Sequence, residues 1–160
     1  MGIAKYVNHQ VHLADGRLVD FDRLLIATGT RVRPWVNQED AAIDEVFTLR
    51  TREDSSGLRA RLASGPKRVL VIGGIFTGSE VASVCCELGL PVTLAERGPT
   101  PLSGALGHAA GTAFAKWQRQ YRVDLRCNVT VMALEGDKDG RGVVKTGIKV
   151  HISGFGGEIR

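Results

Sequence analysis

Hydrophobic and polar positions alternate near the start of the chain and then give way to continuous apolar runs. Residues 10–14 (QVHLA) alternate as a strand does, and Asp15-Gly16 is a turn signal. A second short strand over 18–21 would complete a hairpin. Residues 23–27 (RLLIA) form an unbroken apolar run, which is typical of a strand covered on both faces.

A connecting segment over residues 30–50 leads to a predicted helix over 51–63. Glu53 and Asp54 would lie in the first turn of this helix, where acidic side chains complement the helix dipole. Gly65-Pro66 would end it.

Two further buried strands are predicted, over 68–72 (RVLVI) and over 92–95, with a helix over 78–88 between them. This helix places an apolar stripe at helical spacing, suited to packing on a sheet. The stripe consists of Val81, Val84, Cys85 and Leu88.

The last part of the chain predicts a helix over 106–120, a strand over 123–127 and short strands over 129–135, 142–146 and 148–153. The order of these elements predicts an α/β fold with a parallel sheet. Its parallel sheet would contain 23–27, 68–72, 92–95 and 123–127. We expect helices on one face of this sheet and a β-meander on the other.

Composition favours a globular protein and excludes several classes. Of the 160 residues, 43% are hydrophobic and 24% charged, and no apolar run approaches the roughly 20 residues that span a bilayer. The net charge of +4 comes without a Lys/Arg block, so it does not indicate nucleic-acid binding. The excess lies after residue 66, where it either favours an anionic nucleotide or acidic partner or is merely a solvated surface.

The three cysteines do not suggest a disulfide framework or a metal site. Cys85, Cys86 and Cys127 form no C-x-x-C motif, and their number is odd. We expect them to be small buried hydrophobic residues of a protein in the reducing cytoplasm.

The stretch VLVIGGIFTGSEVAS (69–83) carries the candidate chemistry. A dinucleotide fingerprint G-x-G-x-x-G would place glycines at 73, 75 and 78, and Gly73 and Gly78 are present. Glu96 ends the following strand at about the spacing of 20 residues expected for a carboxylate on the adenosine ribose, and it would favour NAD over NADP. Two plainer interpretations stay open: a Rossmann-like unit that binds no nucleotide, and Glu96 as a solvated carboxylate.

Ile75 stands where the fingerprint has its central glycine. A β-branched side chain there would intrude on the space of the pyrophosphate and weaken dinucleotide binding while leaving the fold intact. In the alternative, Ile75 is turned into the core and the turn no longer offers a phosphate site.

Several segments together resemble the flavin-dependent pyridine nucleotide–disulfide oxidoreductases, in particular their ferredoxin/rubredoxin reductase branch. They are VHLADGRLVDFDRLLIATG (11–29), TRVRPW (30–35), VFTLRTREDSSGLRARL (46–62), RVLVIGGIFTGSEVASVCCELGLPVTLAERGPTPL (68–102) and YRVDLRCNVTVMALEG (121–136). The resemblance implies a Rossmann-like FAD/NAD(P)-binding fold that is incomplete in this chain. It also implies that NADH reduces FAD, which passes electrons singly to a ferredoxin-like carrier. This branch works without an active-site disulfide.

The resemblance also implies roles for particular residues. Glu80 would lie near the nicotinamide, and Glu96 with Arg97 at the adenosine ribose. Thr28 and Gly29 would touch FAD, and Arg33 its phosphates. The NAD phosphate turn would consist of Gly73, Gly74, Ile75, Phe76, Thr77 and Gly78. No catalytic residue and no metal ligand is implied.

The chain also departs from the family's pattern. An FAD-binding G-x-G-x-x-G is absent, Ile75 and Thr77 replace Gly and Ile of the usual turn, and Val32 replaces a usual proline. We therefore expect a remnant of an FAD domain over 1–35, a connecting segment and helix over 36–66, and an NAD-binding-like domain without its last strand over 67–160. This chain alone would bind NAD(H) weakly, turn over little and form a homo-oligomer. The alternative is a non-catalytic structural or interaction module.

Overall fold

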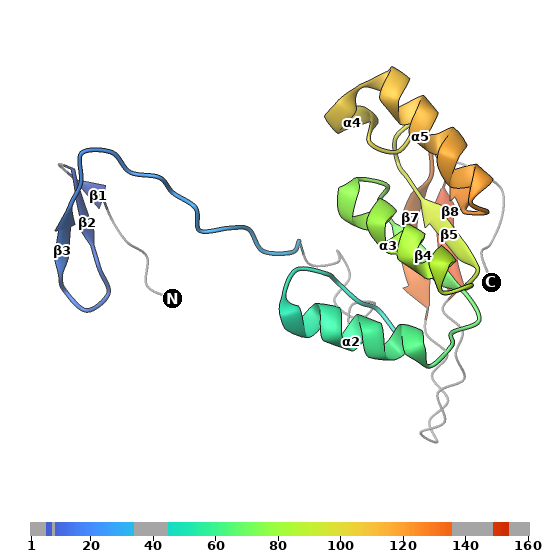
Figure 1. Cartoon of the computed structure of the whole chain (residues 1–160), viewed down its shortest axis with the longest axis horizontal. Helices are drawn as coiled ribbons and strands as arrows, with labels where there is room; N and C mark the ends of the chain where they lie inside the picture. The colour runs from blue at the N-terminus through green and yellow to red at the C-terminus, as the bar shows by residue number, and fades with distance from the viewer. Residues whose placement is uncertain (1–5, 8, 34–44, 136–148, 154–160) are drawn as a thin grey trace. The chain divides into compact units, whose positions relative to one another are not determined.

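The computed structural model describes residues 6, 7, 9–33, 45–135 and 149–153 (Figure 1). The chain divides into two compact units, residues 1–31 and residues 32–160. Each unit has its own sheet structure.

The N-terminal unit holds an antiparallel sheet in the order β1-β2-β3, formed by Tyr6–Val7, Gln10–His12 and Leu18–Asp20. Strands β2 and β3 form the predicted hairpin. Gly16 in its turn has a φ of +84°, a conformation that glycine adopts without steric cost.

The prediction of a strand over 23–27 is wrong, because these residues form an irregular segment after β3. Leu25 is 87% exposed and Ile26 66% exposed. A strand that is apolar on both faces needs hydrogen-bonding neighbours and two covering layers. Among the described residues no strand pairs with this run, so the apolar pattern alone does not make it a strand.

The second unit begins its regular structure with helix α2, Arg52–Ala63. Thr51 caps the helix, and its hydroxyl accepts a hydrogen bond from the N–H of Asp54. The Asp54 carboxylate accepts in return from the N–H of Thr51, which completes a capping box. The predicted helix is confirmed.

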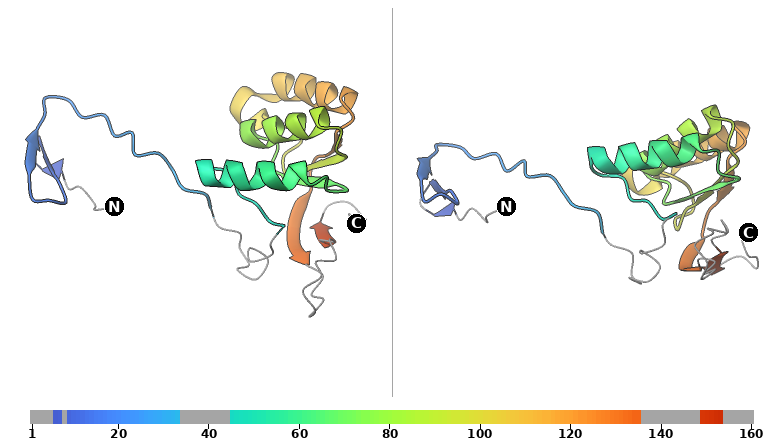
Figure 2. Two further views of the ribbon diagram at one scale, coloured as in Figure 1. Left: turned by 60° about the horizontal axis from the view of Figure 1, so that its bottom comes forward. Right: turned by 90° about the horizontal axis from the view of Figure 1, so that it is seen from below.

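A parallel sheet forms the centre of this unit, with the strand order β4-β5-β6. The strands are Val69–Ile72, Val92–Ala95 and Asp124–Arg126, as predicted from three of the apolar runs. Helix α3, Phe76–Glu87, connects β4 to β5, and α4, Ser103–Leu106, with α5, His108–Gln120, connects β5 to β6. Because the strand order follows the chain and such crossovers are right-handed, α3 and α5 lie on the same face (Figure 2).

The core lies between the sheet and these helices. Val71, Leu94 and Leu125 are neighbours across the three strands and all are buried. Ala82 and Cys85 of α3 are fully buried against them.

The buried face of α3 differs from the predicted stripe, because Val84 and Leu88 are 49% and 57% exposed. The face that meets the sheet consists of Ser79, Ala82 and Cys85. These small side chains let the helix axis approach the strands closely, whereas larger ones would hold it away.

The helix predicted over 106–120 is divided in the structure at Gly107, whose φ is +84°.

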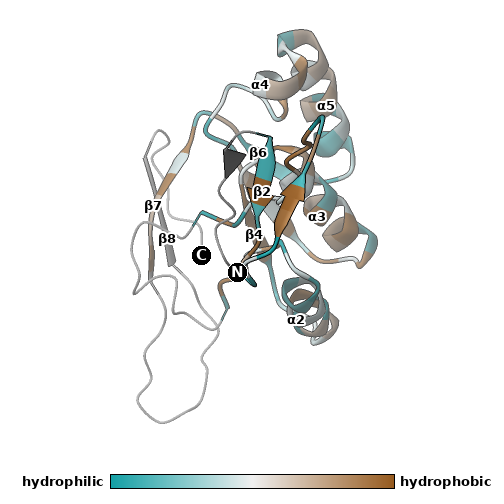
Figure 3. Cartoon of the chain, turned by 90° about the vertical axis from the view of Figure 1, so that its left-hand side faces the viewer, coloured by the Kyte–Doolittle hydropathy of each residue, from teal (hydrophilic) through white to brown (hydrophobic). Residues whose placement is uncertain are grey.

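On the other face of the parallel sheet lies an antiparallel pair, β7, Thr130–Glu135, and β8, Lys149–Ser153 (Figure 3). This arrangement of helices on one face and antiparallel strands on the other confirms the predicted fold class. The strand predicted over 142–146 lies outside the described residues. In the part of the chain that the structure describes, no helix is long and apolar enough to cross a membrane.

Candidate functional site: the turn between β4 and α3

The candidate site begins where β4 ends, at the carboxyl edge of the parallel sheet. Gly73 has a φ of +97°, which side-chain-bearing residues rarely adopt, and its N–H donates to the carbonyl of Ala95 at 2.8 Å. The first glycine therefore allows the chain to turn sharply while it still bonds to the neighbouring strand β5.

Gly78 lies where α3 passes closest to the preceding strand. A Cβ atom built on Gly78 would lie 1.9 Å from the carbonyl oxygen of Gly73 and 3.3 Å from Cγ1 of Val71. No side chain fits at the first of these distances. The last glycine of the fingerprint is therefore required by the packing of helix against strand.

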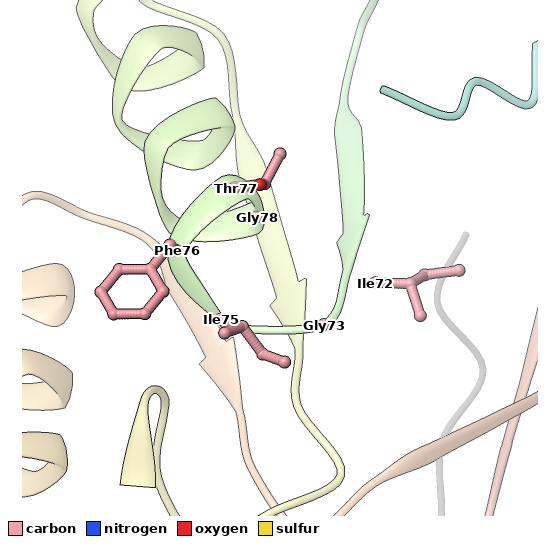
Figure 4. A pocket seen from close by; sticks show the side chains of 6 residues that line it. All are labelled: Ile72, Gly73, Ile75, Phe76, Thr77 and Gly78. Atoms are coloured by element: carbon pink, nitrogen blue, oxygen red, sulfur yellow. The ribbon is translucent and has the colours of Figure 1, made fainter. Parts of the chain in front are cut away.

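The N-terminus of α3 is open to solvent. Ile75 occupies the N-cap position and no side chain caps the helix there. The first backbone N–H groups of a helix have no partner within it, and they carry its positive dipole end. A hollow of about 370 Å³ adjoins this end, lined by Ile72, Gly73, Ile75, Phe76, Thr77 and Gly78 (Figure 4).

The side chain of Ile75 faces this hollow. It is 60% exposed, and Phe76 beside it is 51% exposed (Figure 4). Ile75 is therefore not turned into the core, and the alternative in which it fills the interior is wrong.

Glu96, at the end of β5, is bonded to the turn. Its Oε2 accepts from the N–H of Gly74 and its Oε1 from the N–H of Gly98, both at 2.6 Å. The carboxylate is half-buried and links the turn to the loop after β5. Because an ionised carboxylate can accept about four hydrogen bonds, this one can still accept from a ligand hydroxyl. It is therefore not merely a solvated side chain.

The other sequence-predicted residues lie elsewhere in the chain and are exposed. Glu80 and Arg97 are exposed side chains, the first on α3 and the second in the loop after Glu96. Arg33 is exposed in an irregular segment. Thr28 and Gly29 belong to the N-terminal unit and are also exposed.

Sequence reasoning missed Ser79 and Gln118, which are 7% and 4% exposed. The hydroxyl of Ser79 donates to the carbonyl of Gly74, and the amide of Gln118 donates to Ser79. A polar residue among apolar ones on each helix was visible in the sequence. The pairing was not, because it joins residues on two different helices.

All three cysteines are free thiols, as the sequence predicts. Cys85 is buried, and Cys86 and Cys127 are partly buried. Burial raises the pKa of each thiol above its ordinary value. Thiols that stay protonated are poor nucleophiles, so the raised pKa makes these three thiols less reactive.

Comparison with known proteins places this geometry in a family context. The chain matches the model of the family described as "Pyridine nucleotide-disulphide oxidoreductase" over residues 2–154. The ferredoxin–NAD(+) reductase component of a p-cumate 2,3-dioxygenase system from Pseudomonas putida is 35% identical over 158 residues, covering 92% of this chain and 39% of that protein. Putidaredoxin reductase from the same species is 33% identical over 132 residues, covering 81% of this chain and 31% of that protein.

A solved structure of a covalent putidaredoxin reductase–putidaredoxin complex matches with a TM-score of 0.72 and 29% identity. The match covers 94% of this chain and 36% of that chain. The chain thus spans about a third of the length of the proteins it matches.

Proposed function

Because this chain belongs to the pyridine nucleotide-disulphide oxidoreductase family, we propose that it supplies the NADH-binding unit of a flavin-dependent, ferredoxin reductase-like oxidoreductase. The observation that carries the proposal is the turn at residues 73–78. Its glycines lie at the start of helix α3, whose N-terminus has no side-chain cap. The Glu96 carboxylate, at the end of the next strand, accepts a hydrogen bond from this turn.

The residues of the turn fit a dinucleotide in part. The N–H groups at the start of α3 are donors for a pyrophosphate, and Glu96 has acceptor capacity left for ribose hydroxyls. Ile75 works against the fit, because its side chain lies in the hollow that those N–H groups adjoin. Bound NADH would supply a hydride. The turn itself would hold the phosphates, and Glu96 would orient the ribose.

For the whole protein, we propose that FAD takes the hydride and that a ferredoxin-like carrier receives the electrons. Relatives named as ferredoxin–NAD(+) reductases support this proposal. Thr28, Gly29 and Arg33, all exposed, are the proposed FAD contacts. The division into 1–35, 36–66 and 67–160 and a cytoplasmic location belong to the same proposal.

The test is a titration of the ¹⁵N-labelled protein with NADH and with NADPH, followed by NMR. We expect a Kd for NADH in the high-micromolar range or weaker, with shift changes at the amides of residues 74–78. NADPH should bind more weakly, because its 2′-phosphate would meet the Glu96 carboxylate. Equal affinities would remove Glu96 from its proposed role.

The second candidate is a non-catalytic module that keeps the βαβ unit as a scaffold. Ile75 in the phosphate turn favours it. If millimolar NADH moves no amide signal of residues 73–78, this second candidate replaces the first.

A further inference from the structure

The peptide groups of Gly74 are held on both sides. Its N–H donates to Oε2 of Glu96 at 2.6 Å. Its carbonyl accepts from the N–H of Leu102 at 3.1 Å and from the hydroxyl of Ser79 at 3.2 Å. One donor to the carbonyl thus comes from the loop after β5 and the other from α3.

Holding this carbonyl also sets the direction of the next amide. The peptide between Gly74 and Ile75 is planar and trans, as are the described peptides generally, so its N–H points opposite to its C=O. The carbonyl points toward Ser79 and Leu102. The N–H of Ile75 therefore points away from them, and Ile75 is one of the residues lining the hollow.

Gln118 determines where the Ser79 proton goes. Nε2 of Gln118 lies 3.2 Å from Oγ of Ser79. An amide nitrogen only donates, so the Ser79 oxygen accepts this bond and its single proton is left for the Gly74 carbonyl. The bonds thus run in one direction, from α5 through α3 to the turn.

This arrangement is not what packing alone would select. Both side chains are buried, and among the described residues Oε1 of Gln118 has no hydrogen-bond partner. An unpaired buried acceptor lowers stability. An apolar residue at this position would avoid that cost.

We infer that Ser79 and Gln118 are positioning residues that fix the 74–75 peptide, and with it the Ile75 N–H, for binding of a dinucleotide phosphate. The inference rests on the proposed function of the turn. Two successive glycines, 73 and 74, precede this peptide and leave it free to rotate unless it is held.

The first test is Ser79→Ala, with Ser83→Ala, one turn further along α3, as the matched control. We expect Ser79→Ala to raise the Kd for NADH about fivefold, the effect of one lost hydrogen bond. The backbone order parameter of Ile75 should fall from about 0.85 toward about 0.6 in the ligand-free protein. Ser83→Ala should change neither quantity.

The second test is Gln118→Met, with Gln120→Met on the exposed side of α5 as control. We expect Gln118→Met to raise the Kd about twofold to threefold. The double variant with Ser79→Ala should bind no more weakly than Ser79→Ala alone, because the two residues act through one bond. Fully additive losses would overturn the inference.

A merely structural role predicts a different result. If Ser79 had only a structural role, Ser79→Ala would have a lower free energy of unfolding than the wild type, with the same Ile75 order parameter and the same Kd. That result would also overturn the inference. If the wild-type protein binds no NADH, the proposed function fails. The order parameter of the ligand-free protein then decides whether Ser79 and Gln118 fix the peptide.

Discussion

Ile75 is the residue at which the turn departs from the dinucleotide fingerprint, and its exposed side chain lines the hollow beside the start of α3. In the proposed dinucleotide site, a side chain there would keep a pyrophosphate from some of the N–H groups behind it. Loss of two or three charge-assisted hydrogen bonds, at about 1.5–3 kcal/mol each, raises a Kd by two or more orders of magnitude.

We therefore expect Ile75→Gly to tighten NADH binding at least tenfold, as measured by calorimetry. Ile72→Ala is the control, because Ile72 lines the same hollow from β4 without lying at the phosphate position. If the Gly variant binds no better than the wild type, the turn has the shape of a phosphate site but does not bind a dinucleotide phosphate.

Glu96 combines a proposed role in nucleotide choice with an observed role in holding the turn. Glu96→Gln keeps one acceptor oxygen and loses the charge, so one of its two 2.6 Å bonds cannot persist. We expect the free energy of unfolding to fall by about 1–3 kcal/mol and the preference for NADH over NADPH to disappear. Urea denaturation and parallel titrations measure the two effects, and Glu80→Gln, an exposed carboxylate on α3, should show neither.

At the scale of elements, α2 depends on its N-terminal cap more than on burial, because none of its residues is fully buried. The N–H groups of Thr51 and Arg50 bond to the Asp54 carboxylate and lower its pKa below the ordinary value. A lowered folded pKa stabilises the helix above the unfolded pKa, near 3.9, and this stabilisation is lost as the pH falls through the folded pKa.

We expect Thr51→Ala to destabilise α2 by about 1 kcal/mol at pH 7, seen as faster hydrogen exchange of its amides. In the wild type the same amides should lose protection below pH 4. Asp54→Asn should remove that pH dependence, and a variant that still loses protection there would show that another group is responsible.

The elements also show what the sequence could and could not predict. Local signals were sufficient for the hairpin at Asp15-Gly16 and for the helix predicted over 51–63, because the residues that determine them are neighbours in the chain. The strand predicted from the apolar run at 23–27 was wrong, because a strand also needs partner strands that its own residues do not specify. The predicted burial of Val84 was wrong for a related reason. Helical spacing predicts that the helix has an apolar stripe, but it does not predict which small residues of the helix lie against the sheet.

The candidate site was predicted to a similar extent. Gly73 and Gly78 were found because a turn and a close approach each leave a glycine in the sequence. The hydrogen bonds from Gly74 to Glu96 and from Gln118 to Ser79 join distant segments. No spacing rule points to them.

At the scale of the whole molecule, we expect the 160-residue chain alone to show negligible NADH–acceptor turnover. Hydride transfer requires the flavin ring to be held against the nicotinamide, and this chain spans only about a third of the length of the reductases that it matches. An assay with added FAD and a dye acceptor measures this. Turnover at the rates of complete ferredoxin reductases would refute it.

Exposed apolar side chains lead to a prediction about assembly. Leu25 and Ile26 are largely exposed, and Ile72 on the outer strand β4 is 45% exposed. Apolar groups and an unpaired strand edge favour association with another chain. We expect a homo-oligomer by sedimentation equilibrium at micromolar concentration, and a monomeric mass would count against this.

The turn places unequal demands on two of its fingerprint positions. At Gly78 the carbonyl of Gly73 leaves no room for a side chain, so natural variation there is opposed by folding itself, whatever the protein binds. At Ile75 the side chain meets solvent, so folding exerts no comparable selection. If the turn binds a dinucleotide as proposed, exchanges at position 75 alone can weaken or strengthen binding over evolution, while the fold that surrounds the site is inherited unchanged.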